Sequence, residues 1–543
     1  MTTVAGPPLE GQGGIGALTM GAFLEEVAAT HGPREAVVLD DSLRQGETVR
    51  WTYADLRDRA RGIGRALIAH GIERGDSVGV LMGNRPEAVA ALFGAAMAGA
   101  VVVPLSTFAP RPELAGLLAR SEVTVVLTQD RLLERRLGDD VAALAADLPA
   151  LGTVAVLGTP SWDGFLAEAA DDTALDARID AVGEDDTALV IFSSGTTSAP
   201  KGVVHRHRAP CLQFWIQAQI FGRHPDTRMW SALPLFWTAG LNTAMGATLA
   251  AGGCWVAQEI FDAGTTLALM SRERVTEPYT LPHQATALAE HPDWLATDLS
   301  TLTCVYGKSV FARHPTVEGD THWTMPVGYG LTETCAFFSS HWWSTPRELT
   351  RASMGPLLPG NRLRVVDPDS GRPLGVDEVG ELAIAGPTLM EGYLGVAPEE
   401  CFDADGFFHT GDTGHVDADG HLHFAGRRTE MIKTGGANVS PAELEVQLRA
   451  CPPVKLSRIV GVPDPRLDQV VVACITLKDG ATASAEDIRA FLRERVAPYK
   501  VPKEIVFFAD GEIPMTGGAT KVRDPELLAL VQERLATTPT GDR

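Results

Sequence analysis

Residues 191–202, which read IFSSGTTSAPKG, place hydroxyl groups, glycines and a lysine directly after an apolar run. A strand followed by a turn of this composition makes a concave row of backbone N–H groups that can bind an anion. The hydroxyl side chains add donors, and the lysine adds positive charge. The residues that can bind phosphate here are Ser193, Ser194, Gly195, Thr196, Thr197 and Lys201.

This turn differs from a Walker phosphate loop, which reads G-x-x-x-x-G-K-[ST]. Pro200 precedes the lysine, and Gly202 rather than Ser or Thr follows it. A turn rich in Gly, Ser and Thr is more often an ordinary loop than a phosphate site. The turn alone therefore leaves both interpretations open.

The elements around the turn indicate an α/β fold. Short apolar strands are expected at residues 77–83, 124–128 and 187–194. A helix is expected at 51–71, with Thr52 as its N-terminal cap. Strands that alternate with helices favour parallel pairing in a layered sheet. The uncharged run 88–105 ends in β-branched residues and Pro104, so we expect a small-residue helix and a buried strand there, not a membrane span.

The pattern changes after about residue 360. Shorter strands separated by turns rich in Asp and Gly are expected at residues 362–367, 380–386 and 421–426. A helix at 440–451 and a strand at 468–477 then begin a new pattern. We therefore expect an N-terminal domain, 1–426, and a smaller C-terminal domain, 427–543.

The composition limits the partners of the chain. Its 543 residues include 69 acidic and 46 basic side chains, a net charge of −23, which disfavours nucleic acid or an anionic membrane as the main partner. Seven scattered cysteines without a C-x-x-C pair indicate reduced intracellular thiols. The first twenty residues lack a basic start followed by an apolar block, so we expect a cytoplasmic protein without a secretory signal.

Further segments strengthen the interpretation of the turn. They read GYGLTET at 328–334, GFFHTGDTGHVDADGHLHFAGRRTEMIK at 406–433, GGANVSPAELE at 435–445 and IPMTGGATK at 513–521. With the turn at 191–202, they resemble, in order and over nearly the whole chain, the signatures of the adenylate-forming superfamily of acyl-CoA synthetases, luciferases and adenylation domains. The resemblance implies a large N-terminal domain of layered α/β sheets with a β-barrel-like subdomain, and a small mobile α+β C-terminal domain.

The resemblance implies that a carboxylate displaces pyrophosphate from ATP and forms an acyl-adenylate. Bringing one anion against another requires cations and oriented N–H dipoles to cancel their repulsion. Glu333 and Thr196 are implied to hold Mg²⁺, a hard cation that prefers oxygen ligands. Lys521 is implied to be the catalytic cation between the carboxylate and the α-phosphate.

The resemblance also implies a nucleotide site and a coenzyme A site. Tyr329 would stack on adenine, Thr332 would contact phosphate, and Asp412, helped by Arg427, would accept hydrogen bonds from both ribose hydroxyls. The turn cap of an HTGDTG segment is the alternative role for Asp412. The cofactor-binding set is completed by Gly330, Lys433, Gly435 and Gly436, the last two giving the pantetheine arm of coenzyme A close access to the backbone.

Two positions depart from the family pattern. The final loop reads P-M-T-G-G-A-T-K, one residue longer than the usual P-x-T-x-x-G-K. Extra loop residues cost little closure entropy, so the loop can still deliver Lys521, although a solvent-exposed surface lysine is the alternative. Thr429 stands at the expected hinge, where Asp or Lys is usual.

The acid pocket is implied to contain Trp237, Asn242, Gly307, Lys308 and Cys335. Trp237 replaces a common His, and Lys308 replaces a small apolar residue. An indole narrows the pocket and suits stacking on an aryl acid, while a lysine would hold a second polar or anionic group. Core packing of the indole and a solvent-exposed lysine are the simpler alternatives.

Two enzymatic functions therefore compete. The first is a ligase that uses ATP, Mg²⁺ and coenzyme A on a small aryl or short acyl acid. The second is a diazotase of the same fold that activates nitrite and joins it to an aromatic amine, which the two pocket departures favour. A nucleotide sensor without turnover is disfavoured by four retained residues, Glu333, Asp412, Arg427 and Lys521. The sequence leaves the acid, the acceptor and the oligomeric state open.

Overall fold

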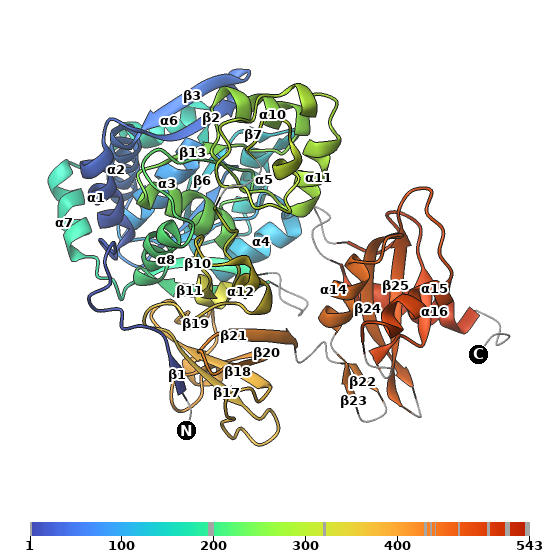
Figure 1. The fold of residues 1–543 in the computed structure, drawn as a ribbon. Helices are drawn as coiled ribbons and strands as arrows, with labels where there is room; N and C mark the ends of the chain where they lie inside the picture. Colours follow the sequence, from blue (N-terminus) through green and yellow to red (C-terminus); the bar gives the residue numbers. More distant parts are fainter. Residues whose placement is uncertain are drawn as a thin grey trace.

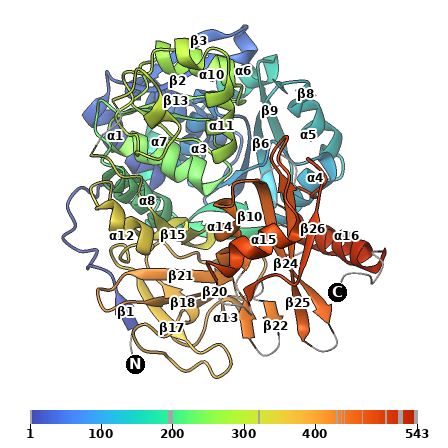
Figure 2. The same cartoon turned by 45° about the vertical axis from the view of Figure 1, so that its right-hand side comes forward.

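The computed structural model describes residues 3–193, 200–318, 322–427, 432–434, 437–439, 441–464, 467–496, 500–515 and 522–537. A large N-terminal body, blue to light orange, is followed by a smaller C-terminal body, darker orange to red (Figure 1). Figure 2 shows the same two bodies from a second side. The combination of mixed and antiparallel sheets covered by helices confirms the predicted fold class.

A seven-stranded sheet contains the two strands that precede and follow residues 194–199. Its strand order is β19-β11-β10-β5-β4-β6-β9. The strands are β4 (Ser77–Leu81), β5 (Val101–Pro104), β6 (Val123–Gln129), β9 (Thr153–Leu157), β10 (Thr187–Ser193), β11 (Lys201–Arg206) and β19 (Gly392–Tyr393). Strands β10, β5, β4, β6 and β9 pair in parallel, as predicted, whereas β11 and β19 add an antiparallel edge.

A second, five-stranded sheet has the order β14-β12-β13-β2-β3. It contains β2 (Glu35–Asp41), β3 (Glu47–Thr52), β12 (Arg228–Ser231), β13 (Cys254–Ala257) and β14 (Glu277–Pro278). Two short pairs lie outside these sheets: β7 (Arg131–Leu132) with β8 (Arg135–Arg136), and β15 (Gly328–Leu331) with β16 (Ala336–Ser340).

Helices cover both sheets of the N-terminal body. They are α1 (Met20–His31), α2 (Tyr53–Ala69), α3 (Pro86–Met97), α4 (Arg111–Arg120), α5 (Leu137–Ala145), α6 (Pro160–Ala167), α7 (Asp172–Ala181), α8 (Arg208–Ile220), α9 (Ala247–Ala250), α10 (Ala263–Arg272), α11 (Pro282–Glu290), α12 (Arg347–Ala352) and α13 (Pro398–Cys401). Short 3₁₀ turns occur at Ser42–Arg44, Trp294–Ala296, Phe311–Arg313 and Thr332–Thr334, and a π-helix at Ala239–Gly246.

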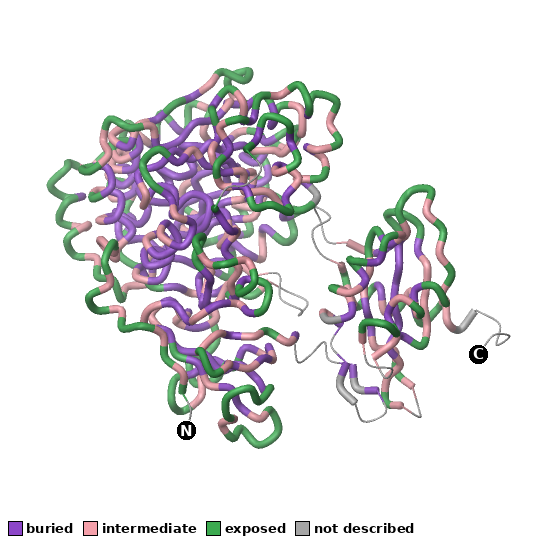
Figure 3. Tube along the Cα trace, viewed as in Figure 1, coloured by how far each residue is buried: buried purple, intermediate pink, exposed green. Residues whose placement is uncertain are grey.

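Local signals explain two of these helices. Thr52 caps α2 as predicted, because its hydroxyl accepts from Asp55 N at 3.1 Å while Thr52 N donates to the Asp55 carboxylate at 2.9 Å. Helix α3 is buried along its whole length (Figure 3). A Cβ at Gly94 would lie 2.6 Å from Ala60 O, so the close packing of α2 on α3 requires glycine there. No described helix has the length and hydropathy needed to span a bilayer.

Apart from β1, the strands of the remaining two larger sheets come from the second half of the chain. An antiparallel half-barrel is built from β1 (Thr3–Ala5), β17 (Arg362–Val366), β18 (Gly380–Ala385), β20 (Phe408–Val416) and β21 (Leu422–Arg427). The C-terminal body contains β22 (Ile432–Thr434), β23 (Ala437–Val439), α14 (Pro441–Arg449), β24 (Val454–Asp464), β25 (Asp468–Leu477), α15 (Ala485–Arg493), β26 (Glu504–Phe507) and α16 (Asp524–Thr537). The boundary at 426/427 stays a prediction, and the proposed hinge residue Thr429 lies outside the described residues.

Candidate active site

The turn predicted to bind phosphate connects two antiparallel strands. Strands β10 and β11 pair down to Ser193 and Lys201, which face each other at the end of the ladder. The sheet therefore fixes both ends of the turn. The described residues exclude four of the predicted phosphate-binding residues, namely Ser194, Gly195, Thr196 and Thr197.

The Glu333 turn is held by a segment more than fifty residues further along the chain. Met390 N donates a hydrogen bond to the Glu333 backbone oxygen at 2.7 Å, and the Tyr393 hydroxyl donates to Glu333 Oε1 at 2.8 Å. The ammonium group of Lys201 lies 4.7 Å from the centre of the Tyr393 ring. The structure thus brings two predicted residues, Glu333 and Lys201, to the same tyrosine.

Two buried contacts fix the backbone around the Glu333 turn. A Cβ at Gly330 would lie 1.9 Å from Ala336 O, so the approach of β15 to β16 requires glycine. His205 on β11 is fully buried, and its Nε2–H donates to Thr332 O at 2.8 Å. Burial lowers the pKa of His205 to about 4, which keeps the imidazole neutral beneath the turn.

The predicted nucleotide residues Tyr329 and Asp412 are in direct contact. The Tyr329 hydroxyl donates to Asp412 Oδ2 at 2.7 Å, and the Tyr329 ring stacks on Phe424 with centroids 5.8 Å apart. Asp412 is only 3% exposed, and Arg427 is its partner in the β20–β21 register. A buried carboxylate with one oxygen held by a phenol is well suited to accept hydrogen bonds from a ribose.

Two of the five predicted acid-pocket residues touch each other. The Asn242 amide nitrogen donates to the Cys335 backbone oxygen and lies 3.5 Å from its sulfur. Asn242 lies in the π-helix, and Cys335 has a φ of 61°, a left-handed conformation that is uncommon outside glycine. π-Helical turns and strained backbone both concentrate at functional sites.

The other pocket residues lie on two separate segments. Trp237 is half-buried and packs edge to face against Phe236 and Phe108, with centroids 5.9 and 6.2 Å apart. Gly307 and Lys308 are exposed on their turn, where Arg347 Nη1 lies 2.7 Å from the position of a Gly307 Cβ. The contact of Lys308 with an acid stays a prediction.

Several predicted residues cannot be placed. Lys521, Gly435 and Gly436 lie outside the described residues, as do the side chains of Arg427 and Lys433. Their roles stay predictions. Lys433 itself belongs to β22, which pairs with β23.

Sequence reasoning missed the residues that hold the site together. Besides His205 and Tyr393, the buried Gln213 on α8 donates to Thr334 O at 3.0 Å and to Phe337 O at 2.7 Å. Gln213 is a polar residue within an apolar run, a signal that a buried hydrogen bond is being made, whereas His205 stands among Arg and His residues without such a signal. Nothing local to Tyr393 indicates its partner Glu333.

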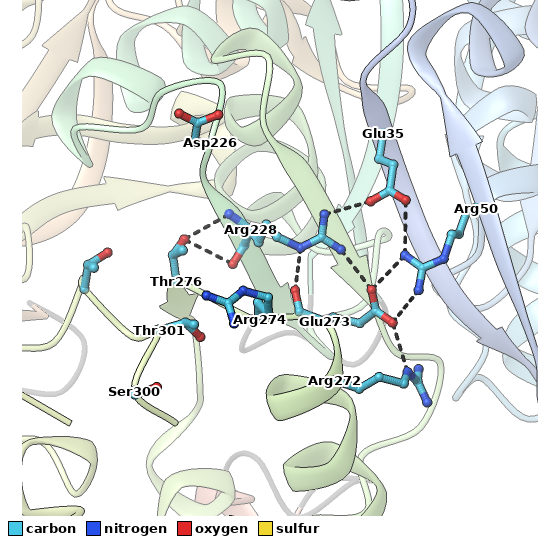
Figure 4. A pocket seen from close by; sticks show the side chains of 11 residues that line it. Glu35, Arg50, Asp226, Arg228, Arg272, Glu273, Arg274, Thr276, Ser300 and Thr301 are labelled. Carbon is cyan, nitrogen blue, oxygen red and sulfur yellow. Dashed lines mark hydrogen bonds and ion pairs between the residues drawn. The ribbon is translucent and has the colours of Figure 1, made fainter. Parts of the chain in front are cut away.

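A surface hollow of about 630 Å³ lies away from these residues (Figure 4). Arg50 donates to the Glu273 carboxylate at 2.7 and 2.8 Å, and Arg228 bridges Glu273 at 2.9 Å and Glu35 at 2.7 Å. Arg272 also pairs with Glu273. Because these guanidinium groups are already paired, we assign the hollow to an ion-pair network that joins β2, β3, β12 and α10, not to catalysis.

Comparison with known proteins identifies the family of the chain. The sequence pattern of the AMP-binding enzyme family matches residues 24–394, and that of the AMP-binding enzyme C-terminal domain matches residues 443–519. The chain therefore belongs to the AMP-binding enzyme family, which confirms the resemblance seen in its motifs.

Individual relatives cover nearly the whole chain. A feruloyl-CoA synthase of Amycolatopsis sp. is 34% identical over 487 residues, covering 88% of this chain and 93% of that protein. The structure of ATP-bound MatB from Rhodopseudomonas palustris has a TM-score of 0.79 and 28% identity, covering 95% of this chain and 99% of that one. The anthranilate CoA ligase AuaEII in complex with anthranoyl-AMP has a TM-score of 0.79 and 25% identity, with coverages of 95% and 98%.

Proposed function

We propose that this protein is an ATP-dependent ligase that adenylates an aryl carboxylic acid and transfers the acyl group to coenzyme A. The observation that carries the proposal is the buried Tyr329–Asp412 pair, whose carboxylate is suited to accept hydrogen bonds from a ribose, in a chain of the AMP-binding enzyme family. Relatives named for ferulate and anthranilate support an aryl acid as the substrate.

The described residues fit a magnesium-nucleotide complex. Glu333 offers a half-buried carboxylate that is hydrogen-bonded by Tyr393, as the carboxylate ligands of metal ions usually are. Glu333 and Thr196 would hold the ion. When bound, Mg²⁺ would offset the negative charge of the phosphates.

Different residues of the chain are assigned different roles in the first half-reaction, the formation of the acyl-adenylate. Asp412, helped by Arg427, holds the ribose, and the Tyr329 ring stacks on adenine. Residues 194–199 and Lys201 hold the phosphates. Lys521 brings positive charge to the carboxylate oxygen that attacks the α-phosphorus, and pyrophosphate leaves. This assignment rests on the motif positions and on the contacts of Tyr329 and Asp412.

The acid pocket is proposed to lie between Trp237 and the Asn242–Cys335 contact. The edge-to-face aromatic cluster of Trp237, Phe236 and Phe108 offers ring faces and edges to an aryl acid. Lys308, exposed on its turn, is proposed to contact a polar substituent of the acid at the entrance of this pocket.

The second half-reaction is assigned to the C-terminal domain, 427–543. Rotation near Thr429 would remove Lys521 and bring Gly435 and Gly436 to the site, where the thiol of coenzyme A attacks the adenylate.

The seven cysteines are all free thiols, which supports a reducing, cytoplasmic compartment.

A pyrophosphate-release screen tests the proposal. Aryl acids, fatty acids, malonate and nitrite are each supplied with ATP, with and without coenzyme A or an arylamine. We expect release with aryl acids and coenzyme A-dependent formation of AMP. Release only with nitrite plus an arylamine would overturn the ligase and identify the diazotase, and release with no compound would overturn both.

A variant of Trp237 tests whether this residue lines a pocket for aryl acids. Trp237→Ala should lower kcat/KM for the best aryl acid about fivefold more than for acetate, because stacking on an aromatic ring contributes about 1 kcal/mol beyond burial. Trp162→Phe, a conservative change of a buried indole on α6, serves as the control. Equal losses for both acids in Trp237→Ala would contradict an aryl pocket at this residue.

A further inference from the structure

The two-residue strand β19 forms the edge of the seven-stranded sheet beside the predicted phosphate turn. Tyr393 pairs with Val203 and Gly392 with Val204. Backbone hydrogen bonds of 2.8 Å from Glu391 N to Val204 O and from Leu394 N to Gly202 O extend the pairing on both sides. Segment 391–394 is therefore fixed to β11, the strand that begins two residues after the turn.

Met390, directly before this segment, and Tyr393 within it hold the backbone and the side chain of Glu333, respectively. Met390 N reaches the Glu333 backbone oxygen at 2.7 Å, and the Tyr393 hydroxyl reaches Oε1 at 2.8 Å. A carboxylate at the end of a glutamate rotates freely unless such a contact fixes it. The short strand thus links β11, which follows the predicted phosphate-binding residues, to the Glu333 carboxylate, which is proposed to face the nucleotide.

The Tyr393 ring is itself held from two sides. It packs edge to face on Phe408, with centroids 6.2 Å apart, and the Lys201 ammonium lies over it at 4.7 Å. A cation over an aromatic face is attracted by the ring electrons. Because the ring is positioned by strand pairing, by Phe408 and by Lys201, its hydroxyl is a fixed donor.

We propose that Tyr393 is a positioning residue for the magnesium-nucleotide complex. Its hydroxyl donates a hydrogen bond to Oε1 of Glu333 and thereby fixes the orientation of the carboxylate. Oε2 is then available to bind Mg²⁺. The Lys201 ammonium group stabilises the position of the tyrosine ring. The inference rests on the proposed ATP chemistry and adds a residue that the motifs do not contain. Outer-shell partners of this kind typically contribute 10- to 100-fold to metal affinity.

Nucleotide binding without an acid tests this role, because no turnover then occurs. The affinity for ATP is measured by calorimetry over a range of Mg²⁺ concentrations for the full chain and for Tyr393→Phe. We expect the Mg²⁺ concentration for half-maximal tightening of ATP binding to rise about tenfold, while the Kd for AMP without Mg²⁺ stays unchanged. An unchanged Mg²⁺ dependence, or equal losses for ATP and AMP, would overturn the proposal.

A control and a double-mutant cycle separate positioning from folding. Tyr53→Phe also removes a buried phenol, whose hydroxyl donates to Gly253 O at 2.6 Å, and it should lower Tm without changing the Mg²⁺ dependence. In a Glu333→Gln background, Tyr393→Phe should have no further effect on the Mg²⁺ dependence. Additive effects would overturn action through Glu333.

Two further outcomes remain decisive. If Tyr393→Phe fails to fold, Tyr393→His removes the phenol oxygen while keeping a ring over Phe408, and the same tenfold shift is expected. If no acid is ever activated but the Mg²⁺ shift is seen, the proposed ligase reaction fails while the positioning role stands.

Discussion

At the scale of single residues, the Tyr329–Asp412 hydrogen bond is central to the nucleotide site. The bond joins residues 83 positions apart and fixes a carboxylate that is 3% exposed. A buried carboxylate is costly unless its oxygens find donors. Tyr329 is one donor, and the carboxylate is proposed to accept from the ribose hydroxyls as well.

Replacing the carboxylate tests this role. Asp412→Ala should lower kcat/KM for ATP about 10²-fold, roughly 3 kcal/mol, because two hydrogen bonds to a charged group are lost. Tyr329→Phe keeps the ring and removes only the phenol donor, so its loss should be about tenfold or less. Steady-state kinetics at saturating acid measure both, and an unchanged kcat/KM in Asp412→Ala would contradict the assignment.

A second residue-scale prediction concerns acid stability. Burial lowers the pKa of His207 to about 4, with Asp186 opposing the shift and Arg74 adding to it. The unfolded chain binds the proton near pH 6.5, so the contribution of His207 to stability is complete above pH 6.5 and is lost as the pH falls toward 4. His207 Nδ1 accepts from Met20 N at 3.2 Å, and Asn can keep an acceptor there.

His207→Asn should therefore reduce the loss of stability between pH 6.5 and pH 4 by about 3 kcal/mol. Thermal unfolding of both proteins across this pH range measures the difference. If the two pH profiles have the same slope, His207 does not titrate as described.

At the scale of elements, Arg85 connects the start of α3 to the second sheet. Its guanidinium is 1% exposed and pairs with Asp41 at 3.0 Å, Glu87 at 2.9 Å and Glu259 at 3.5 Å. The neighbouring Asn84 donates to Leu233 O at 2.8 Å, which anchors the segment before Trp237. The packing of α3 and the position of the aromatic cluster are therefore coupled.

Arg85→Met should lower the free energy of unfolding by about 3–5 kcal/mol, because three carboxylates are left buried without their cation. Arg57→Met, which removes an exposed pair with Asp58, should cost less than about 1 kcal/mol. Urea unfolding compares the two variants. Equal effects would show that the Arg85 network carries no special stability.

The elements also show what the sequence could predict. Strand β25 lies at the predicted residues 468–477, and Thr52 caps α2 as expected, because both depend on local patterns. The π-helix at Ala239–Gly246 and the left-handed Cys335 were not predicted, because both depend on contacts made across the fold. The motifs identified Glu333 and Asp412 as site residues. They did not identify Tyr393, because its role depends on a contact with Glu333 across the fold.

At the scale of the whole molecule, the proposed mechanism requires two domains to share one reaction centre. The N-terminal body presents Glu333, Tyr329 and Asp412, whereas Lys521 follows Met515, the last described residue before it on the C-terminal body. A lysine from a separate domain can leave after the first half-reaction, which allows one site to serve two reactions.

Lys521→Ala should lower the rate of ATP–pyrophosphate exchange by a factor on the order of 10² or more, as expected for a lost charge-stabilising group. Lys503→Ala removes an exposed lysine of the same domain and should leave exchange unchanged. An unchanged exchange rate in Lys521→Ala would assign the catalytic cation elsewhere.

Transfer of oxygen from acid to AMP tests the central claim most directly. An aryl acid labelled with ¹⁸O in both carboxylate oxygens is incubated with ATP, coenzyme A and the enzyme. The ¹⁸O content of AMP and of the thioester is then measured by mass spectrometry. Attack of the carboxylate on the α-phosphorus followed by thiolysis predicts AMP with one ¹⁸O and a thioester with the other. Unlabelled AMP, or no AMP with any acid, would contradict the account.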